Sequence, residues 1–321
     1  MITAQKKQTE RQSNASERPK VVVIVGPTAS GKTALSIALS KTFNGEVISA
    51  DSRQVYVGLD IGTGKVTKEE MSGVRHHLLD IADARSVFSA DAFVQYATRA
   101  IADCHARAVT PIIAGGTGFY IDALIGRITL GDVPADATLR ASLSTYTPAE
   151  LCTLLQECDP ERYADIVRKN EVNNKVRLVR AIEIAKGGGN PHTIASEGPY
   201  DTLTIGITHP RDALRQRINQ RLHERIEQGM FAEVQRLHND GLSWERMDQL
   251  GLEYRYSAQY LQGNLTLEKT EEILQQKIWQ YARRQLTYWK RNANIQWFKP
   301  DDTTAISLCV KNFLTNDTNS N

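Results

Sequence analysis

The chain has 321 residues, 41% of them hydrophobic and 24% charged, a balance typical of a globular protein with a buried core and not of a disordered chain. The formal net charge of +2 excludes a protein that binds nucleic acid through its overall charge, so any basic surface for RNA must be local. The four cysteines form no C-x-x-C pair, which argues against a disulfide framework or structural zinc and favours a reducing, cytoplasmic setting.

The two ends of the chain are polar. Residues 1–19 lack the apolar stretch of a secretory signal, and no run in the chain approaches the roughly 20 apolar residues of a membrane helix. We therefore expect a disordered N-terminal tail over 1–19, a disordered end over TNDTNSN, no contact with a membrane and a cytoplasmic location.

Short apolar runs alternate with helical patterns in the first part of the chain. The runs that predict buried strands are VVVIVG (21–26), EVISAD (46–51), HHLLDI (76–81), TPIIAGG (110–116) and, further on, TLTIGITH (202–209). Helices are predicted over 33–42 and 89–107. Strands separated by helices predict a parallel sheet with helices on both faces.

The stretch from Pro134 to Gly189 shows helical patterns only, namely ATLRASLSTY, PAELCTLLQEC and KVRLVRAIEIAKGG. The predicted fold class is therefore α/β, a P-loop NTPase-like parallel sheet with an inserted all-helical subdomain. The predicted parts are a tail over 1–19, a core over 20–130 and 200–300 with a helical C-terminal part, the insertion over 131–199 and a C-terminal tail over 301–321.

Beyond residue 210 the chain is mostly helical again. One apolar face recurs every four residues, at Leu214, Ile218 and Leu222. A neighbouring face repeats arginines at the same spacing, at Arg217, Arg221 and Arg225. Both repeats predict a single amphipathic helix.

The stretch GPTASGKT contains the complete pattern G-x-x-x-x-G-K-[ST] between a predicted strand and a predicted helix. In this context backbone N–H groups and the helix N-terminus cradle a phosphate. The predicted phosphate-binding residues are Gly26, Pro27, Thr28, Ala29, Ser30, Gly31, Lys32 and Thr33. Lys32 offers a positive charge to the outer phosphates, and the Thr33 hydroxyl is a predicted ligand of Mg²⁺. A Gly-rich turn without a ligand is the alternative, but it would not need Lys-Thr after the second glycine.

Three more polar residues follow predicted strands. Asp51 ends the second strand in SADSRQVYVGLDIGTGK (49–65), where the ligand crevice of an open α/β sheet forms, so it is a candidate general base; a turn-capping role is the alternative. Thr117 lies between glycines in GGTGFYIDAL (115–124) and can approach a ligand closely. Asp80 is either an acid near Mg²⁺ or a polar end of a strand.

Eight motifs occur in a fixed order over residues 20–298: GPTASGKT, ISADSRQVY, DIGTGK, HHLLDI, FSADAF, GGTGFYI, RLVRAIEI and YARRQLTYWKR. Each is weak alone, but the ordered set closely resembles the tRNA dimethylallyltransferases, also called isopentenyl-tRNA transferases. The resemblance implies transfer of the dimethylallyl group of dimethylallyl diphosphate to N6 of adenosine 37, in tRNAs that read codons beginning with U. In that family the P-loop holds the diphosphate. The implied partners are dimethylallyl diphosphate and the tRNA anticodon stem-loop, the implied cofactor is Mg²⁺, and we expect a monomer.

The resemblance also implies roles for single residues. The implied catalytic residues are Asp51 as base for the adenine amine, Thr117 in the reaction channel, Lys32 and Arg140. The implied tRNA contacts are Asp51, Ser52, Arg53, Gln54, Thr117, Arg140, Val176, Arg177, Leu178, Val179, Arg180, Gly251, Tyr254 and Arg255. Two elements depart from the family's pattern: Glu253 lies where a glycine is usual, and EVNNKV replaces a proline–asparagine–aspartate run.

The stretch KIWQYARRQLTYWKR interleaves aromatic and basic residues, as RNA-binding surfaces do. An ordinary amphipathic helix that buries Ile278, Ala282, Gln285 and Trp289 is the alternative. Together with Arg177 and Arg180, this stretch predicts a basic clamp on RNA. A P-loop kinase of small molecules or nucleotides is the alternative function, and an RNA-binding NTPase is a third. The kinase leaves the crevice loops unexplained, and the NTPase lacks a recognisable hydrolytic motif.

Overall fold

The computed structural model describes residues 18–130, 133–189 and 198–315. The chain divides into two compact units, one from residues up to 125 together with those from 198 onward, the other from residues 126–197. The disorder expected over 1–19 and TNDTNSN concerns residues that lie almost entirely outside the described ranges. Within those ranges, no helix has the length and apolar character needed to cross a membrane.

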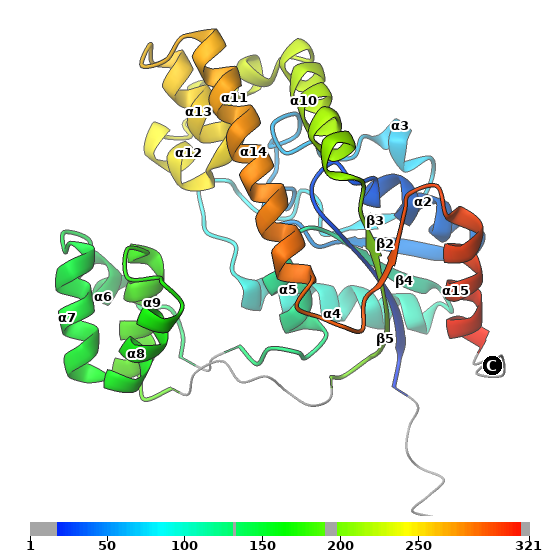
Figure 1. Ribbon diagram of the computed structural model, residues 1–321, viewed down its shortest axis with the longest axis horizontal. Helices are drawn as coiled ribbons and strands as arrows, with labels where there is room; N and C mark the ends of the chain where they lie inside the picture. The colour runs from blue at the N-terminus through cyan, green and yellow to red at the C-terminus, as the bar shows by residue number, and fades with distance from the viewer. Residues whose placement is uncertain (1–17, 131–132, 190–197, 316–321) are drawn as a thin grey trace, which may run out of the picture. The chain divides into compact units, whose positions relative to one another are not determined.

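The first unit is built on a parallel six-stranded sheet (Figure 1), which confirms the predicted class. In spatial order its strands are β3 (His76–His77), β2 (Gly45–Ser49), β4 (Thr110–Ala114), β1 (Lys20–Val25), β5 (Asp201–Ile207) and β6 (Gln296–Phe298). The predicted strand over 76–81 is wrong beyond His77, because Leu78 and Asp80 adopt positive φ angles of 64° and 54°. Such angles do not continue an extended strand.

Helices cover both faces of this sheet, as predicted. Val21, Val23 and Val25 of β1 share a buried cluster with α4 (Ala90–Ala106) and α5 (Gly118–Leu124). Val22 and Ile24 share one with α2 (Lys32–Thr42) and α15 (Thr303–Thr315), as Figure 1 illustrates. Because side chains alternate along a strand, the buried apolar run from Val21 to Val25 fits a central strand covered on both sides.

The region predicted as a C-terminal tail over 301–321 contains α15, which buries Ile306 and Val310 against the sheet. Strand β6 precedes it and pairs with β5 in the register Ile205 to Gln296. The sequence did not reveal β6 because three residues carry too little periodicity. Helix α5 forms within GGTGFYIDAL, a stretch whose glycines predict only a loop.

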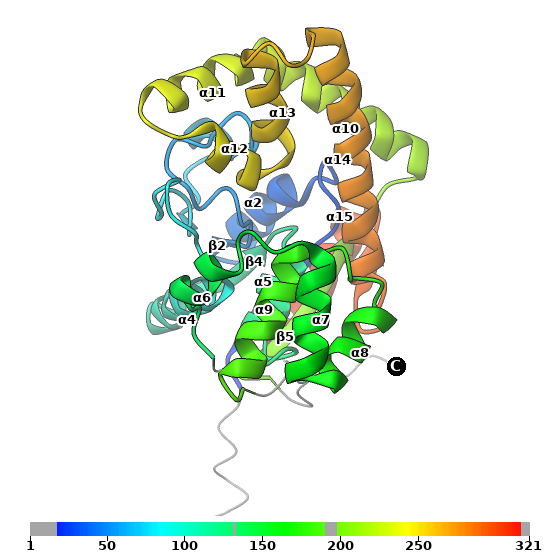
Figure 2. The same cartoon turned by 90° about the vertical axis from the view of Figure 1, so that its left-hand side faces the viewer.

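The helical C-terminal part of this unit contains α10 (Arg211–Glu227), α11 (Met230–Asn239), α12 (Trp244–Leu250), α13 (Leu252–Leu261) and α14 (Leu267–Trp289), which Figure 2 shows gathered together. Leu214, Ile218 and Leu222 are buried, so the predicted apolar face of α10 is confirmed. They join Leu274, Ile278 and Ala282 of α14 in one core cluster. A short helix, α3 (Lys68–Met71), follows the loop after β2.

The elements in the described part of the second unit are all helices. It consists of α6 (Ala137–Ser142), α7 (Pro148–Cys158), α8 (Pro160–Arg168) and α9 (Lys175–Lys186). Leu151, Leu155, Leu178 and Ile182 form its core. Helix α8 was not predicted, since it holds a single buried residue, Ile166.

Candidate functional site

The loop GPTASGKT connects β1 to α2, and its glycines are required by the backbone. Gly26 has a φ of 148°, and a Cβ there would lie 2.3 Å from the carbonyl oxygen of Ile207. Gly31, the N-cap of α2, has a φ of 96°. Only glycine adopts such angles without strain. The sequence thus forms a strand–loop–helix turn that aims backbone N–H groups and a helix N-terminus at one place.

Two side chains of this loop are prepared for an anion. Lys32 donates to the carbonyl oxygen of Pro27 over 2.6 Å, and burial lowers the pKa of its ammonium to about 8. The hydroxyl of Ser30 is buried and has no hydrogen-bond partner within the described part of the chain. Since a buried hydroxyl without a partner is costly, the Ser30 hydroxyl is suited to donate to a bound ligand.

A cavity of about 700 Å³ opens beside the loop, within the size range of small-molecule sites. It lies within the first unit, at the carboxyl ends of β2 and β4. Its charged lining residues include Lys32, Asp51, Arg53, Glu70, Arg217, Arg221, Arg225, Glu253 and Arg284. The predicted phosphate residues Thr28 to Thr33 line it as well, so the structure brings them together with Asp51.

Asp51 has two separable functions in this geometry. Its Oδ1 accepts from the backbone N–H groups of Arg53 at 2.8 Å and of Gln54 at 3.3 Å, which caps the turn after β2. Its Oδ2 makes no hydrogen bond that the described residues show. The capping interpretation is therefore correct for one oxygen, and the second oxygen is available to a substrate.

Thr117 lies at the N-cap of α5 and accepts from the backbone N–H of Ser52 at 3.1 Å. It therefore contacts the turn that carries Asp51, although it does not line the cavity itself. The neighbouring Gly115 permits this approach, because a Cβ there would lie 2.1 Å from the carbonyl oxygen of Ala50.

Gln285 of α14 connects the GPTASGKT loop to the loop that contains Thr117. Its Oε1 accepts from the backbone N–H of Thr28 at 2.8 Å, and its Nε2 donates to the carbonyl oxygen of Gly116 at 3.0 Å. Sequence reasoning placed Gln285 on the buried face of an amphipathic helix and missed this function. A polar residue on a predicted apolar face was the available signal.

The arginines of α10 are the main site residues that sequence reasoning did not assign. Arg217 donates from Nε to the carbonyl oxygen of Ala29 at 3.0 Å. Arg225 pairs with Glu253 at 3.1 Å. Arg221 has no hydrogen bond or ion pair that the described residues show, and burial together with the charge of Arg225 lowers its pKa to about 10. The repeat of arginines beside a buried leucine face was the signal that could have found them.

Other predicted RNA contacts are engaged within the first unit. Ser52, Arg53, Gln54 and Gly251 line the cavity. Tyr254 also lines the cavity but is only 2% exposed, and it donates its hydroxyl to Glu233 at 2.8 Å, so the hydroxyl forms an internal hydrogen bond while the implied RNA contact of Tyr254 stays a prediction. Arg255 pairs with Asp248 at 2.8 Å at the surface. Asp80 accepts from Lys65 at 2.5 Å, which favours an ion-pair partner over an acid near Mg²⁺.

Arg140 and the segment from Val176 to Arg180 belong to the second unit. There the buried carboxylate of Glu183 accepts from Arg140 at 2.7 Å and from Arg180 at 3.1 Å. Arg177 pairs with Glu171. Val176 is exposed and Val179 packs against the core, while Leu178 is fully buried; its predicted contact with RNA is therefore wrong. The catalytic role implied for Arg140 stays a prediction.

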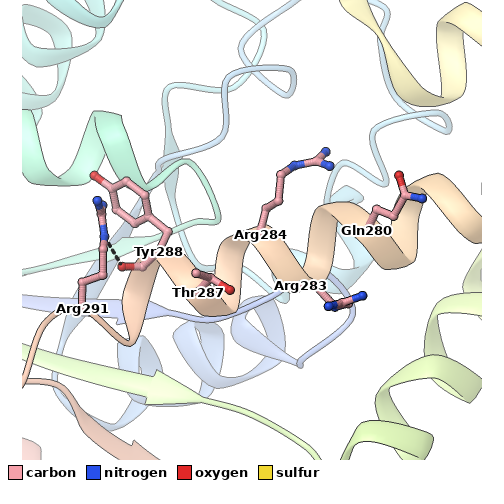
Figure 3. Close-up of a pocket in the computed structure, with 6 residues that line it drawn as sticks. All are labelled: Gln280, Arg283, Arg284, Thr287, Tyr288 and Arg291. Atoms are coloured by element: carbon pink, nitrogen blue, oxygen red, sulfur yellow. Dashed lines mark hydrogen bonds between the residues drawn. The ribbon is translucent and has the colours of Figure 1, made fainter. Parts of the chain in front are cut away.

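The outer face of α14 is basic (Figure 3). A shallow pocket there is lined by Gln280, Arg283, Arg284, Thr287, Tyr288 and Arg291. The guanidinium of Arg291 lies 4.1 Å from the centre of the Tyr288 ring, and its Nε donates to the Tyr288 carbonyl. Ile278, Ala282, Gln285 and Trp289 are buried, so the amphipathic helix is confirmed. Its basic face is available to an RNA backbone, and binding there stays a prediction.

These features define an α/β protein whose glycine-rich loop and arginines prepare an anion site beside a carboxylate. The family model for IPP transferase matches residues 54–292. The chain is 41% identical over 296 residues to a tRNA dimethylallyltransferase of Halalkalibacterium halodurans, covering 89% of this chain and 92% of that one. It is 43% identical over 283 residues to tRNA dimethylallyltransferase 2 of Treponema denticola, covering 86% and 93%.

Solved structures agree with these relatives. A tRNA isopentenylpyrophosphate transferase from Bacillus halodurans matches with a TM-score of 0.71 and 38% identity, over 94% of this chain and 98% of the other. A eukaryotic dimethylallyltransferase acting on tRNA matches with a TM-score of 0.77 and 27% identity, over 93% and 80%. The chain belongs to the IPP transferase family. This confirms the resemblance found in the eight motifs, and no observation favours the alternative of a small-molecule kinase.

Proposed function

We propose that this chain is a tRNA dimethylallyltransferase that moves the dimethylallyl group of dimethylallyl diphosphate to N6 of adenosine 37, in tRNAs that read codons beginning with U. One observation supports this more than any other: the anion donors and the free oxygen of Asp51 line one cavity. A leaving diphosphate and the attacking amine have to meet in such a place.

The reaction divides between two groups of residues that line this cavity, the anion donors and Asp51. The N6 nitrogen attacks the allylic carbon, the bond from that carbon to the diphosphate oxygen breaks, and the diphosphate leaves with the electron pair. Lys32, Arg221, Ser30 and the N–H groups of the loop stabilise the charge that develops on the departing oxygens. Asp51 accepts the proton that the amine loses as the new bond forms.

The residues present fit Mg²⁺, a hard cation that takes hydroxyl and phosphate oxygens together with water. Thr33 lines the cavity, and its hydroxyl makes no hydrogen bond that the described residues show. Thr33 would hold the ion together with the diphosphate oxygens. When bound, the ion neutralises part of the diphosphate charge.

The substrate tRNA has to present an unstacked base. Extruding a base from an anticodon loop costs a few kcal/mol, and RNA-binding proteins recover this cost by stacking and phosphate contacts. The basic face of α14 and the exposed Arg177 are the surfaces that suit such contacts. We expect tRNA affinity to fall steeply with rising salt concentration.

The test compares two aspartates that cap turns in the same way. Asp83 Oδ1 accepts from the backbone N–H of Arg85 at 2.8 Å, as Asp51 Oδ1 does from Arg53, but Asp83 lies outside the cavity. Asn keeps the capping oxygen at either position and removes the base. With labelled dimethylallyl diphosphate and bulk tRNA, we expect Asp51→Asn to lower single-turnover transfer into RNA about 10²- to 10⁴-fold. Asp83→Asn should transfer label at the wild-type rate.

Two results would contradict the proposal. Wild-type protein that hydrolyses ATP but transfers no label to tRNA would exclude the function. Full single-turnover transfer by Asp51→Asn would keep the function and remove Asp51 from the role of base.

A further inference from the structure

The three arginines of α10 lie along one cavity but differ in their partners. Residues four apart on a helix are separated by about 6 Å along its axis, so Arg217, Arg221 and Arg225 form a row roughly 12 Å long. Arg217 is tied to the phosphate loop, and Arg221 makes no hydrogen bond or ion pair that the described residues show, although the charges of Glu70 and Glu224 act on it. Only Arg225, at the end of the row, meets a carboxylate, that of Glu253.

The pair of Arg225 and Glu253 is enclosed. Their side chains are 12% and 14% exposed, and the Nη1 of Arg225 also donates to the carbonyl oxygen of Gly62 at 3.3 Å. The guanidinium packs on Gly64, where an added Cβ would lie 2.1 Å from Nη2. Arg225 therefore has little room to turn toward a ligand while Glu253 holds it.

The loop against which Arg225 packs is fixed in turn. The buried carboxylate of Glu233 accepts from three successive backbone N–H groups, those of Asp60, Ile61 and Gly62, at 2.7 to 3.1 Å. Charged acceptors form strong hydrogen bonds with backbone donors. The loop beside Arg225 is thus held in place by Glu233, and the charge of Arg225 is compensated by Glu253.

The consequence is an unequal distribution of charge along the cavity. Lys32 lies close enough to Asp51 and Arg221 for their charges to act on it, while Glu253 neutralises Arg225 at the end of the arginine row. A diphosphate fits the loop end. Arg53 and Arg284 also line the cavity, but of the three arginines of α10 it is Arg225 that a carboxylate neutralises. A further phosphate near this pair would meet the negative charge of Glu253, and like charges at close range repel strongly inside a protein.

We propose that Glu253 is a specificity-determining residue: by holding Arg225 it withholds the third arginine from anions, so that the cavity accepts a diphosphate in preference to a triphosphate chain. This rests on the proposed function, because it assumes that a diphosphate is the group held at the loop. It explains how a loop pattern shared with nucleotide-binding proteins can serve a substrate with two phosphates.

The experiment measures the binding of inorganic diphosphate and inorganic tripolyphosphate by calorimetry at constant Mg²⁺ concentration. Glu253→Gln keeps the shape of the side chain and releases the charge of Arg225. We expect it to raise the ratio of tripolyphosphate to diphosphate affinity about tenfold or more, since a charged hydrogen bond to the added phosphate becomes possible. The double variant Glu253→Gln with Arg225→Gln should return to the wild-type ratio.

Glu245→Gln is the matched control, because Glu245 is exposed on α12 and lies outside the cavity. It removes the same charge and should leave the ratio unchanged. Circular dichroism checks that each variant is folded. If Glu253→Gln does not fold, Glu253→Asp keeps the charge while stretching the pair, and a smaller shift of the same sign is expected.

The outcomes separate the two proposals. If wild-type protein binds diphosphate but neither Glu253 variant changes the ratio, the specificity role is overturned and the proposed function stands. A shift that persists in the double variant would also overturn it, since Arg225 would then not be the cation released. If wild-type protein binds neither anion, both proposals are overturned.

Discussion

The arginines of the two units have opposite surroundings. In the second unit, Arg140 and Arg180 share the buried carboxylate of Glu183, and Arg177 pairs with Glu171. The resemblance had implied substrate contacts for all three arginines. In the structure, two of them neutralise a carboxylate that would otherwise be buried without a counterion, and the implied substrate contacts stay predictions.

The arginines of α10 carried no assigned role, yet they line the cavity. Arg217 donates to a carbonyl oxygen, and Arg221 makes no hydrogen bond or ion pair in the described part of the chain. What makes Arg221 available to an anion is thus that no carboxylate forms an ion pair with it in the described part of the chain, although Glu70 lines the same cavity. Three variants test this contrast between the units, from the largest expected effect to the smallest.

Arg221→Ala should have the largest effect on catalysis. It removes a cation that forms no ion pair in the described part of the chain from the proposed diphosphate site, so kcat/KM for dimethylallyl diphosphate should fall about 10²-fold. Steady-state transfer to tRNA measures this. The control is Arg215→Ala, since Arg215 is exposed on the same helix and does not line the cavity. Equal rates for both variants would remove Arg221 from the anion site.

Glu183→Gln should act on stability of the second unit. It leaves Arg140 and Arg180 without their counterion, and because both arginines are partly exposed to water we expect a cost of about 2 kcal/mol. Hydrogen exchange of α6, α7 and α9 should accelerate, while exchange in the sheet stays unchanged. Glu157→Gln, at an exposed position of α7, is the control. Unchanged exchange in α9 would show that Glu183 does not hold this unit together.

Arg177→Ala should have the smallest effect. The Arg177 side chain is 56% exposed, so its ion pair with Glu171 contributes little and stability should change by less than about 0.5 kcal/mol. If Arg177 contacts RNA, tRNA affinity falls a few-fold and the salt dependence of binding loses about one unit of slope. Arg168→Ala, exposed on α8, is the control. If the salt dependence of tRNA binding has the same slope in both variants, Arg177 does not contact RNA.

Much of the fold could be predicted from the sequence because its signals are local. The run VVVIVG, the pattern GPTASGKT and the repeat from Leu214 to Leu222 each specify an element within a few residues. Strand β6 and the packing of α15 depend on partners about 90 or more residues away in β5, and no local pattern reports them. Strand β3 ends at His77 because Leu78 and Asp80 have positive φ angles, and neither residue type predicts such an angle.

In the site, too, the residues marked by local sequence patterns could be predicted, and the pairings between distant residues could not. Asp51 and the phosphate loop follow from strand ends and a motif, both local. The pairing of Arg225 with Glu253 and of Arg140 with Glu183 joins residues 28 and 43 positions apart. In the sequence, Arg225 and Arg140 look the same as Arg221. Only the folded structure shows which of these arginines pairs with a carboxylate.

The amide of Gln285 limits which side chain its position can hold. It accepts from one loop and donates to another, so glutamate would lose the donor, lysine or arginine would lose the acceptor, and asparagine would be one methylene too short to span both. Rotating the amide by 180° would set like groups against each other at both ends. The length of this one side chain thus sets the spacing between the GPTASGKT loop and the loop that carries Thr117.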